Sequence, residues 1–485
     1  MSGGKHDAAP HQPRCPISSY AMAAARPMHE YGMRCEDLVV VAIAARSAAQ
    51  PRDGAQPYRR EGHRPVEVAL IAWPRGSKRP GALCGLRVLD LSGLLGGPFS
   101  AQILSEHGAN VIKVELAAGD GTRTWGPPLV DGTASCFIGI NRNKRGLVPE
   151  LSRVEVREIV LRPLLNADML VENFKTGTLE RWGLSYEEAL CNRLSRPIHC
   201  RISGRGAHGP VGGARGHDAV AQALSGLMSV NGDPASGPPR IGIPIVDMGS
   251  GLNAVIGILL ALDESRSTDA GRFIDASLLD TAEGLLHPHA ANWFVDGQQP
   301  QLAGSGHPDV APYAKFAIRS GEIFLGICGD GQFRKFRELV GAPELATDPD
   351  FSRNGERSRN RDSLRAFIEA VPVDRGAAAL CHALLKAGVP AGPAHSLPEG
   401  QEHPRTRHRR MMVDLGTGQR GLGVSVKLSS VPGQAHAPAP RIGQHTREVL
   451  GALGYAESEI DALVEARLAV HPPGSYPPAR PAESS

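Results

Sequence analysis

One carboxylate in this sequence stands where its charge is costly. Asp247 lies between the apolar run IGIPIV (241–246) and the small residues GSG (249–251), which lead into a long apolar segment. Apolar surroundings disfavour an ionised carboxylate, so the placement indicates either chemistry or a local structural task. A carboxylate that is partly desolvated and held in line with an electrophile is a useful nucleophile. The alternative is that Asp247 caps a helix over 251–262, and the two roles are compatible.

The elements around Asp247 are typical of a parallel α/β sheet. A buried strand, a helix ended by Gly108 and a second strand form a βαβ unit: LRVLDLS (86–92), FSAQILSEHG (99–108) and NVIKVE (110–115). Further strands are predicted at DMLVENF (168–174) and PIHCRISG (197–204), and long helices at 217–230, 250–264 and 277–294. The turn GLLGGP (93–98) lacks the GxGxxG spacing, so a dinucleotide site is not favoured.

The secondary structure predicted for the later part of the chain is different. Short strands and helices are predicted between about 300 and 400, among them EIFLGIC (322–328) and DSLRAFIEA (362–370). The last predicted helices are two, separated at Gly454. The length of 485 residues favours two or more lobes.

Composition excludes several classes of protein. Hydrophobic residues make up 41%, charged residues 21%, and the net charge is +3, so nothing global favours nucleic acid or an anionic membrane. The eight cysteines form no CxxC pair and no metal-ligand spacing, which is typical of reduced thiols in a cytoplasmic protein. The apolar runs are shorter than the roughly 20 residues that span a bilayer, and no secretion signal is recognisable. We expect a cytoplasmic protein without a metal site.

Both ends of the chain differ from the rest. Residues 1–80 are rich in Arg, Ala and Pro with weak periodicity, and 471–485 form a second Pro-rich segment. Such segments bury too little apolar surface to offset the entropy of ordering them. We expect 1–80 to be disordered or not part of the working protein, and 471–485 to be a disordered tail.

Eight segments, in order, resemble the class III CoA-transferase family, which also contains the α-methylacyl-CoA racemases. They lie between Leu83 and Val470 and read GLRVLDLSGLLGGPFSAQILSEHGANVIKVE, NRNKR, VENFKTGTLERWGL, GHDAVAQALSGLMSV, IGIPIVDMGSGLNAVIGILLAL, GSGHPDVAPY, AGVPAGPAHSL and IGQHTREVLGALGY. The resemblance implies an α/β fold with a Rossmann-like large domain at 81–299, completed by 396–470, and a smaller inserted α+β domain at 300–395. It also implies a homodimer of two chains interlocked like linked rings.

The resemblance assigns Asp247 the role of nucleophile. In the transferases the matching aspartate attacks an acyl-CoA thioester, forms an aspartyl mixed anhydride and then an aspartyl-CoA thioester, from which an acceptor carboxylic acid collects the CoA. The small residues 249–251 would leave room for the thioester. Backbone N–H groups at the start of the 251–262 helix would stabilise a developing oxyanion.

His217 leaves a second activity open. In the racemases a His and an Asp at matching motif positions exchange a proton at the α-carbon of a 2-methylacyl-CoA, and here these are His217 and Asp247. Transferases more often carry an aromatic residue at the position of His217. A purely structural role, such as a hydrogen bond to CoA or to a neighbouring loop, is equally open. The adjacent Asp218 is interpreted as a cap of the helix at 218–227.

CoA requires basic groups for its phosphates. Matching the family's motifs residue by residue implies CoA contacts from Leu95, Gly96, Lys144, Asn173, Phe174, Lys175, Arg181 and Arg215, with Arg145 as a weaker candidate. His307 and His445 are interpreted as structural or loop residues.

Two departures from the family pattern support a third hypothesis. Leu116 stands where the family usually has a basic residue, and Pro149 stands where backbone contacts to CoA are expected. These changes are compatible with a CoA-binding homologue whose catalysis is weakened.

Overall fold

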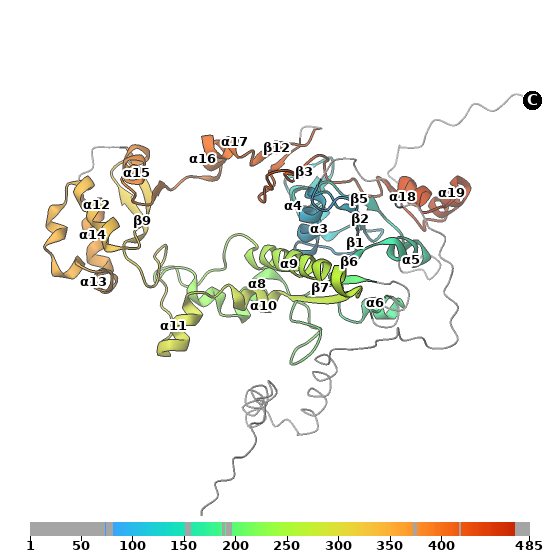
Figure 1. The fold of residues 1–485 in the computed structure, drawn as a ribbon, viewed down its shortest axis with the longest axis horizontal. Coiled ribbons are helices and arrows are strands. Elements are labelled where there is room, and N and C mark those ends of the chain that lie inside the picture. The colour runs from blue at the N-terminus through green and yellow to red at the C-terminus, as the bar shows by residue number, and fades with distance from the viewer. Residues whose placement is uncertain are drawn as a thin grey trace, which may run out of the picture. The chain divides into compact units, whose positions relative to one another are not determined.

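The computed structural model describes residues 81–150, 157–186, 196–371, 376–416 and 419–470, together with Trp73 and Leu190 (Figure 1). The predictions for the segments 1–80 and 471–485 concern chain outside these residues, apart from Trp73. Everything below refers to the described part.

A six-stranded parallel sheet organises the N-terminal half. Its order is β5-β2-β1-β6-β7-β8, which in chain order is 3-2-1-4-5-6, the Rossmann order. The strands are β1 (Arg87–Asp90), β2 (Asn110–Val114), β5 (Arg145–Leu147), β6 (Met169–Glu172), β7 (Ile198–Ser203) and β8 (Arg272–Ser277). The four strands predicted from the sequence are confirmed, whereas β5 and β8 were not predicted. The α/β class is therefore confirmed.

Helices cover both faces of this sheet. Among the described residues before 300 these helices are α3 (Gly96–Glu106), α4 (Ser135–Ile140), α5 (Arg157–Asn166), α6 (Thr178–Arg181), α8 (Asp218–Leu224), α9 (Ile245–Thr268), α10 (Leu278–Gly284) and α11 (His289–Asp296). Three predicted boundaries were wrong. α9 begins six residues earlier than 251, so the residues 249–251 lie inside the helix; α8 ends at Leu224; and the helix predicted over 277–294 is two helices separated before His289. Pro288 stands at that break and cannot donate a helical hydrogen bond.

Alternate residues of β1, β2 and β6 pack into two separate cores. Val88 packs in a core with residues of α3 and α9, such as Leu104 and Ile258. Its neighbour Leu89 faces the opposite side, where it packs with residues of α5 and of the C-terminal helices. Those helices are α18 (Thr446–Ala452) and α19 (Glu457–Glu465), which supply Val449, Leu450 and Ile460 to this core.

A third core contains residues between Ala311 and Val389 and shares none with the other two. Its strands are β9 (Tyr313–Ile318), β10 (Gly321–Gly326) and β11 (Ala391–Pro393), which form an antiparallel sheet in the order β11-β10-β9. Around it lie α12 (Asp330–Val340), α13 (Asn354–Arg359), α14 (Arg361–Ala370) and α15 (Ala377–Lys386), followed along the chain by α16 (Leu397–Glu402), α17 (Pro404–His408), β12 (Met412–Asp414) and β13 (Arg420–Leu422). β3 (Leu129–Val130) and β4 (Thr133–Ala134) form a small hairpin of their own.

Candidate active site

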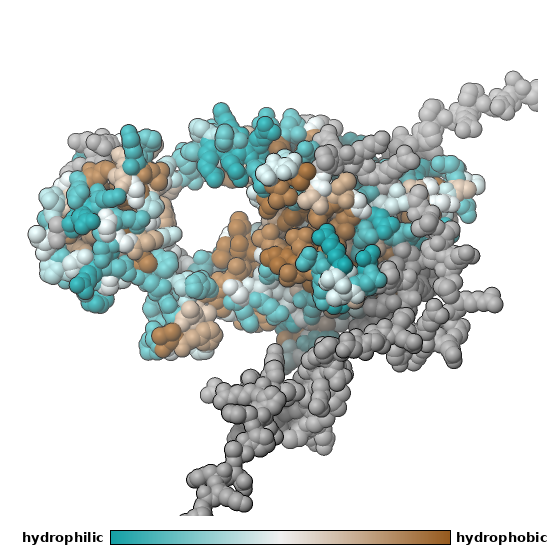
Figure 2. All heavy atoms as spheres, viewed as in Figure 1, coloured by the Kyte–Doolittle hydropathy of each residue, from teal (hydrophilic) through white to brown (hydrophobic). Residues whose placement is uncertain are grey.

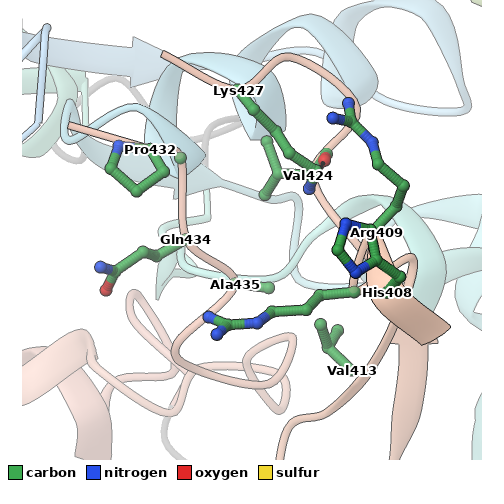
Figure 3. Close-up of a pocket in the computed structure, with 10 residues that line it drawn as sticks. His408, Arg409, Val413, Val424, Lys427, Pro432, Gln434 and Ala435 are labelled. Atoms are coloured by element: carbon green, nitrogen blue, oxygen red, sulfur yellow. Dashed lines mark hydrogen bonds between the residues drawn. The ribbon is translucent and has the colours of Figure 1, made fainter. Parts of the chain in front are cut away.

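One cavity of about 520 Å³ is lined by cationic and apolar side chains (Figure 3). Its lining residues are His408, Arg409, Arg410, Val413, Val424, Lys427, Pro432, Gly433, Gln434 and Ala435. No carboxylate, thiol or hydroxyl belongs to that lining, so it lacks the carboxylate nucleophile that the sequence predicts. None of the residues predicted for the site lies there.

A second cavity of about 480 Å³ lies at the carboxyl ends of the parallel strands. Segments that follow β1, β6 and β7 line it, and the N-terminal ends of α8 and α9 complete it. β1 and β6 are neighbours at the point where the strand order reverses, which is where open α/β sheets bind ligands. Eight of the ten predicted site residues line this cavity: Leu95, Gly96, Asn173, Phe174, Lys175, Arg215, His217 and Asp247. Lys144 and Arg181 are not among its lining residues.

Asp247 lies in the first turn of α9 and is partly buried. Its carboxylate accepts no hydrogen bond from the part of the chain that the structure describes. Burial, and then the neighbouring charge of Asp218, raise the pKa of Asp247 from its ordinary value to about 6. The group is therefore mostly ionised at neutral pH but has lost much of its stabilising solvent, as a nucleophile requires.

Asp218, not Asp247, caps α9. One oxygen of the buried Asp218 carboxylate accepts hydrogen bonds from the backbone N–H groups of Val246 at 2.8 Å and Asp247 at 3.1 Å. The N-cap position itself is Pro244, which makes no side-chain cap, so the interpretation of Asp247 as the cap was wrong. Asp218 is also the first residue of α8 and not its cap, because His217 occupies that position.

The cap by Asp218 changes the source expected for oxyanion stabilisation. The N–H groups of Val246 and Asp247 already donate hydrogen bonds to Asp218. These two groups are therefore not free to donate to a substrate oxygen. Gly96 lines the cavity at the N-terminal end of α3. The first N–H groups of a helix have no partner within it, which makes the start of α3 the available source of donors.

Two glycines allow the N-terminal ends of α3 and α9 to meet. A Cβ on Gly251 would lie 2.7 Å from the carbonyl oxygen of Gly96, and one on Gly96 would lie 3.1 Å from the carbonyl oxygen of Asp247. A Cβ at the first distance would force the backbone to shift, and one at the second would be tighter than most real contacts, so glycine suits both positions. The small residues after Asp247 therefore serve helix packing in part, and they place Asp247 beside the loop that follows β1.

The loop after β1 is held from two sides. Asn173 donates to the Gly93 carbonyl at 2.7 Å and accepts from the Gly93 N–H at 2.8 Å. Lys113, fully buried, donates to the Ser92 carbonyl at 2.8 Å. The side-chain amide of Asn173 thus shapes the loop that carries Leu95 and Gly96.

Lys144 belongs to a buried ionic network beneath this loop. Its ammonium group forms an ion pair with Asp90 at 2.9 Å, and both side chains are 0% exposed. It also donates to the Pro98 carbonyl at 2.7 Å and to Asn141 at 2.8 Å, which uses all three donors. Burial lowers the pKa of Lys144 to about 8, against the opposing charge of Asp90. A direct contact with CoA would require this network to open.

The remaining predicted cations differ in position. Lys175 and Arg215 are exposed side chains on the cavity lining. Arg181 is exposed on α6 and its guanidinium donates to the Thr178 hydroxyl at 3.1 Å. Phe174 also lines the cavity and packs edge-to-face on Trp182, with ring centroids 5.2 Å apart.

The other residues singled out in the sequence lie away from the cavity lining. Leu116 is 46% exposed after β2, and Pro149 pairs with Ala469 in an isolated bridge. Arg145 forms an ion pair with Glu448 at 2.8 Å. His445 accepts a hydrogen bond from the Gly146 N–H at 3.1 Å. His307 contacts the ring of Tyr313, with centroids 5.3 Å apart.

Among the lining residues that sequence reasoning missed, two have large side chains, and the capping role of a third residue was misassigned. Trp125 and Arg240 both line the cavity, and Asp218 was assigned to the wrong helix. The segment PPRIGIP (238–244) leads directly to Asp247, which was a usable signal for Arg240. Trp125 follows a long irregular segment whose path the sequence alone does not define. Within the described residues, no group of three His, Cys, Asp or Glu side chains could hold a metal ion.

Comparisons with known proteins agree on one family. The family model described as CoA-transferase family III matches residues 83–446. A succinate–glutarate CoA-transferase from Agrobacterium fabrum is 33% identical over 384 residues, which cover 76% of this chain and 95% of that protein. An acetyl-CoA:oxalate CoA-transferase from Acetobacter aceti is 36% identical over 372 residues, 76% of this chain and 95% of that protein.

A solved structure gives the same result for the fold. The crystal structure of a CAIB/BAIF family protein from Brucella suis superposes with a TM-score of 0.70 at 36% identity. The match covers 77% of this chain and 100% of that one.

Proposed function

The chain belongs to CoA-transferase family III, and from this premise we propose that Asp247 carries CoA from an acyl-CoA donor to a carboxylic acid acceptor. The observation that supports the proposal is the placement of one partly desolvated carboxylate, with a pKa of about 6, on the lining of the cavity at the sheet's switch point. The same lining presents the exposed cations Lys175 and Arg215, which suit the phosphates of CoA.

The proposed reaction needs no outside reactant. A carboxylate oxygen of Asp247 attacks the thioester carbon, the carbon–sulfur bond breaks, and CoA leaves as a thiolate with a mixed anhydride on Asp247. The thiolate then attacks the aspartyl carbon, which releases the donor acid and forms an aspartyl-CoA thioester. The acceptor carboxylate attacks the aspartyl carbon of that thioester, which breaks the carbon–sulfur bond, expels CoA thiolate and leaves a second mixed anhydride. The thiolate then attacks the acceptor's acyl carbon in this anhydride, which forms the acceptor's CoA thioester and frees the Asp247 carboxylate. The start of α3 would stabilise the oxyanions.

Trapping with hydroxylamine tests the role of Asp247. Enzyme incubated with acyl-CoA and hydroxylamine should lose activity and carry an aspartyl hydroxamate on the peptide that contains Asp247, as mass spectrometry would show. Asp247→Asn should take up no label and should lose roughly a thousandfold or more of its turnover. Full turnover without any label at Asp247 would contradict the proposal. Binding of CoA by the wild type without measurable turnover of any acyl-CoA would support the weakened homologue instead.

His217 supports a second candidate, a 2-methylacyl-CoA racemase. His217 and Asp247 line the same cavity, so an acid–base pair across a substrate α-carbon is open to this site. Such an enzyme would exchange the α-proton with solvent deuterium in heavy water without any acceptor acid. His217→Ala would abolish that exchange, whereas a transferase would keep most of its turnover in this variant.

The proposal also includes a homodimer, in which a second copy of the chain covers the exposed face of α9. α9 is long and apolar enough to cross a membrane by length and composition, but one side of it packs in the core with α3, β7 and β8. Its other side exposes Leu252, Ile256, Leu259 and Leu260, and Figure 2 shows hydrophobic atoms gathered where Figure 1 draws α9. Apolar surface of this kind marks an interface. The family resemblance favours an interlocked homodimer as its cover.

The proposal also includes the arrangement of the domains and the cellular location of the protein. The separate third core, between Ala311 and Val389, supports a smaller domain at 300–395. The packing of α18 and α19 under the parallel sheet supports a return of 396–470 to the larger domain. The five cysteines of the described chain are free thiols, which supports a cytoplasmic location.

A further inference from the structure

Arg240 presents a guanidinium to the catalytic cavity without a carboxylate partner. It lines the cavity that contains Asp247, and its side chain is exposed. Its one hydrogen bond in the described chain is a long contact of 3.3 Å to the backbone carbonyl of the adjacent Ile241. The positive charge is therefore available to a ligand.

A buried hydrogen-bond relay fixes the backbone next to Arg240 relative to Asp247. The N–H of Ile241 donates to Gln222 at 2.8 Å, and the amide nitrogen of Gln222 donates to Asp218 at 2.6 Å. Asp218 in turn accepts from the N–H of Asp247 at 3.1 Å. Gln222 is 0% exposed, and both ends of its amide are used in this relay. The segment that carries Arg240 is thus attached, through two buried side chains, to the backbone of the nucleophile.

The other exposed cations on the lining belong to different segments. Lys175 follows β6 and Arg215 follows β7, and the proposed function assigns both to CoA. Arg240 instead precedes α9, and the backbone next to it is linked to the backbone of Asp247 through Gln222 and Asp218. An acceptor that attacks the aspartyl thioester with one carboxylate brings any second carboxylate into a cavity that also contains the carboxylate of Asp218, which repels it. A guanidinium binds a carboxylate through two parallel hydrogen bonds.

We propose that Arg240 binds the distal carboxylate of the acceptor, so that this enzyme prefers dicarboxylic acids to monocarboxylic acids of the same length. This inference rests on the proposed CoA transfer. It adds a residue that selects the acceptor and a substrate class to that function.

The test compares glutarate with pentanoate, which have the same five-carbon chain and differ in the second carboxylate. With one acyl-CoA donor at saturation, the wild type should prefer glutarate. Arg240→Gln should lower kcat/KM for glutarate by about thirtyfold, mainly through KM, and that for pentanoate by no more than about threefold. Arg240→Lys should restore part of the preference, because lysine keeps the positive charge but cannot form the two parallel hydrogen bonds of a guanidinium.

Arg215→Gln is the matched control, since it removes another exposed cation of the same cavity. It should raise KM for the acyl-CoA and leave the ratio of glutarate to pentanoate turnover in place. Equal losses for both acceptors in Arg240→Gln, or no preference for glutarate in the wild type, would overturn the inference.

Calorimetry of glutarate binding separates this inference from the proposed function. Glutarate that binds the CoA-loaded wild type about tenfold or more tightly than Arg240→Gln supports the role of Arg240, even if no acid is turned over, and only the proposed function then fails. If the enzyme transfers CoA to glutarate but both proteins bind glutarate equally well, the role of Arg240 is refuted and the proposed CoA transfer is supported.

Discussion

Asp247 carries its charge with little help from the surrounding chain. Its carboxylate has no hydrogen-bond donor among the described residues, and both burial and the charge of Asp218 oppose ionisation. The pKa of about 6 places the group near the lower end of the physiological range, so that it is ionised at neutral pH and easily protonated below. A nucleophile of this kind is active only in its ionised form.

The pH dependence follows from this shift. Because protonation removes the nucleophile, kcat/KM for the acyl-CoA should fall about tenfold per pH unit below a midpoint near pH 6. Asp218→Asn removes the like charge and keeps an oxygen for the α9 cap, so its midpoint should move to lower pH. Steady-state rates from pH 4.5 to 8, in buffers of constant ionic strength, provide the measurement. An acid limb that stays near pH 6 in this variant would show that Asp218 does not influence the titrating group.

At the scale of elements, the site depends on how closely α3 and α9 approach. Gly96 and Gly251 bring the two helix ends together, and Asp218 of α8 caps α9. The positions of α3 and α9 along the chain could be predicted from their apolar patterns, but their mutual contact could not. In a single sequence, the spacing of the glycines does not show which helices will pack together. The presence of an aspartate at the start of one helix likewise does not show that it will cap another.

The limits of the sequence-based prediction have the same origin. Leu95 and Asn173, which the family resemblance assigns to CoA contacts, both line the cavity, because each lies beyond the carboxyl end of a parallel strand and such ends meet at one edge of the sheet. Lys144 lies in the structure within a buried network, and Arg240 was missed. Whether a basic side chain faces a ligand or an internal carboxylate depends on contacts between distant segments, which spacing does not show.

Gly251→Ala tests the helix contact. Its new methyl group would lie 2.7 Å from a backbone oxygen, so the variant should lose about 1–3 kcal/mol of unfolding free energy in urea and lose activity as α9 shifts. Gly284→Ala, in α10, is the matched control, since nothing lies within 4 Å of a Cβ there. It should be neutral or slightly stabilising, because alanine favours helix. Equal stability of the two variants would contradict the packing role of Gly251.

At the scale of the whole molecule, α9 joins the active site to the proposed interface. Its first turn carries Asp247, one side packs in the core, and the other side leaves Leu260 67% exposed. A single helix thus couples the position of Asp247, the proposed nucleophile, to whatever covers its outer face. Association of two chains would therefore also stabilise the catalytic geometry.

Charges on that outer face should separate the chains. Ile256→Asp combined with Leu260→Asp places two carboxylates where both side chains are more than half exposed, so the monomer should fold but the homodimer should not form. Light scattering after size exclusion should give the mass of one chain for this variant and of two for the wild type. Leu385→Asp, at an exposed leucine of α15, should keep the wild-type mass. A wild type that is monomeric would refute the interface.

The packing of the C-terminal helices has a consequence for how the protein is made. Val449, Leu450, Leu453 and Ile460 close the same apolar face as Leu89, Ile112 and Leu170, although more than 270 residues separate the two sets. A chain leaving the ribosome must therefore carry one side of its sheet covered only in part, by α5, while the sequence up to the C-terminal helices is synthesised. Nascent chains halted before about residue 446 should consequently engage chaperones, and release of the final helices should end that engagement.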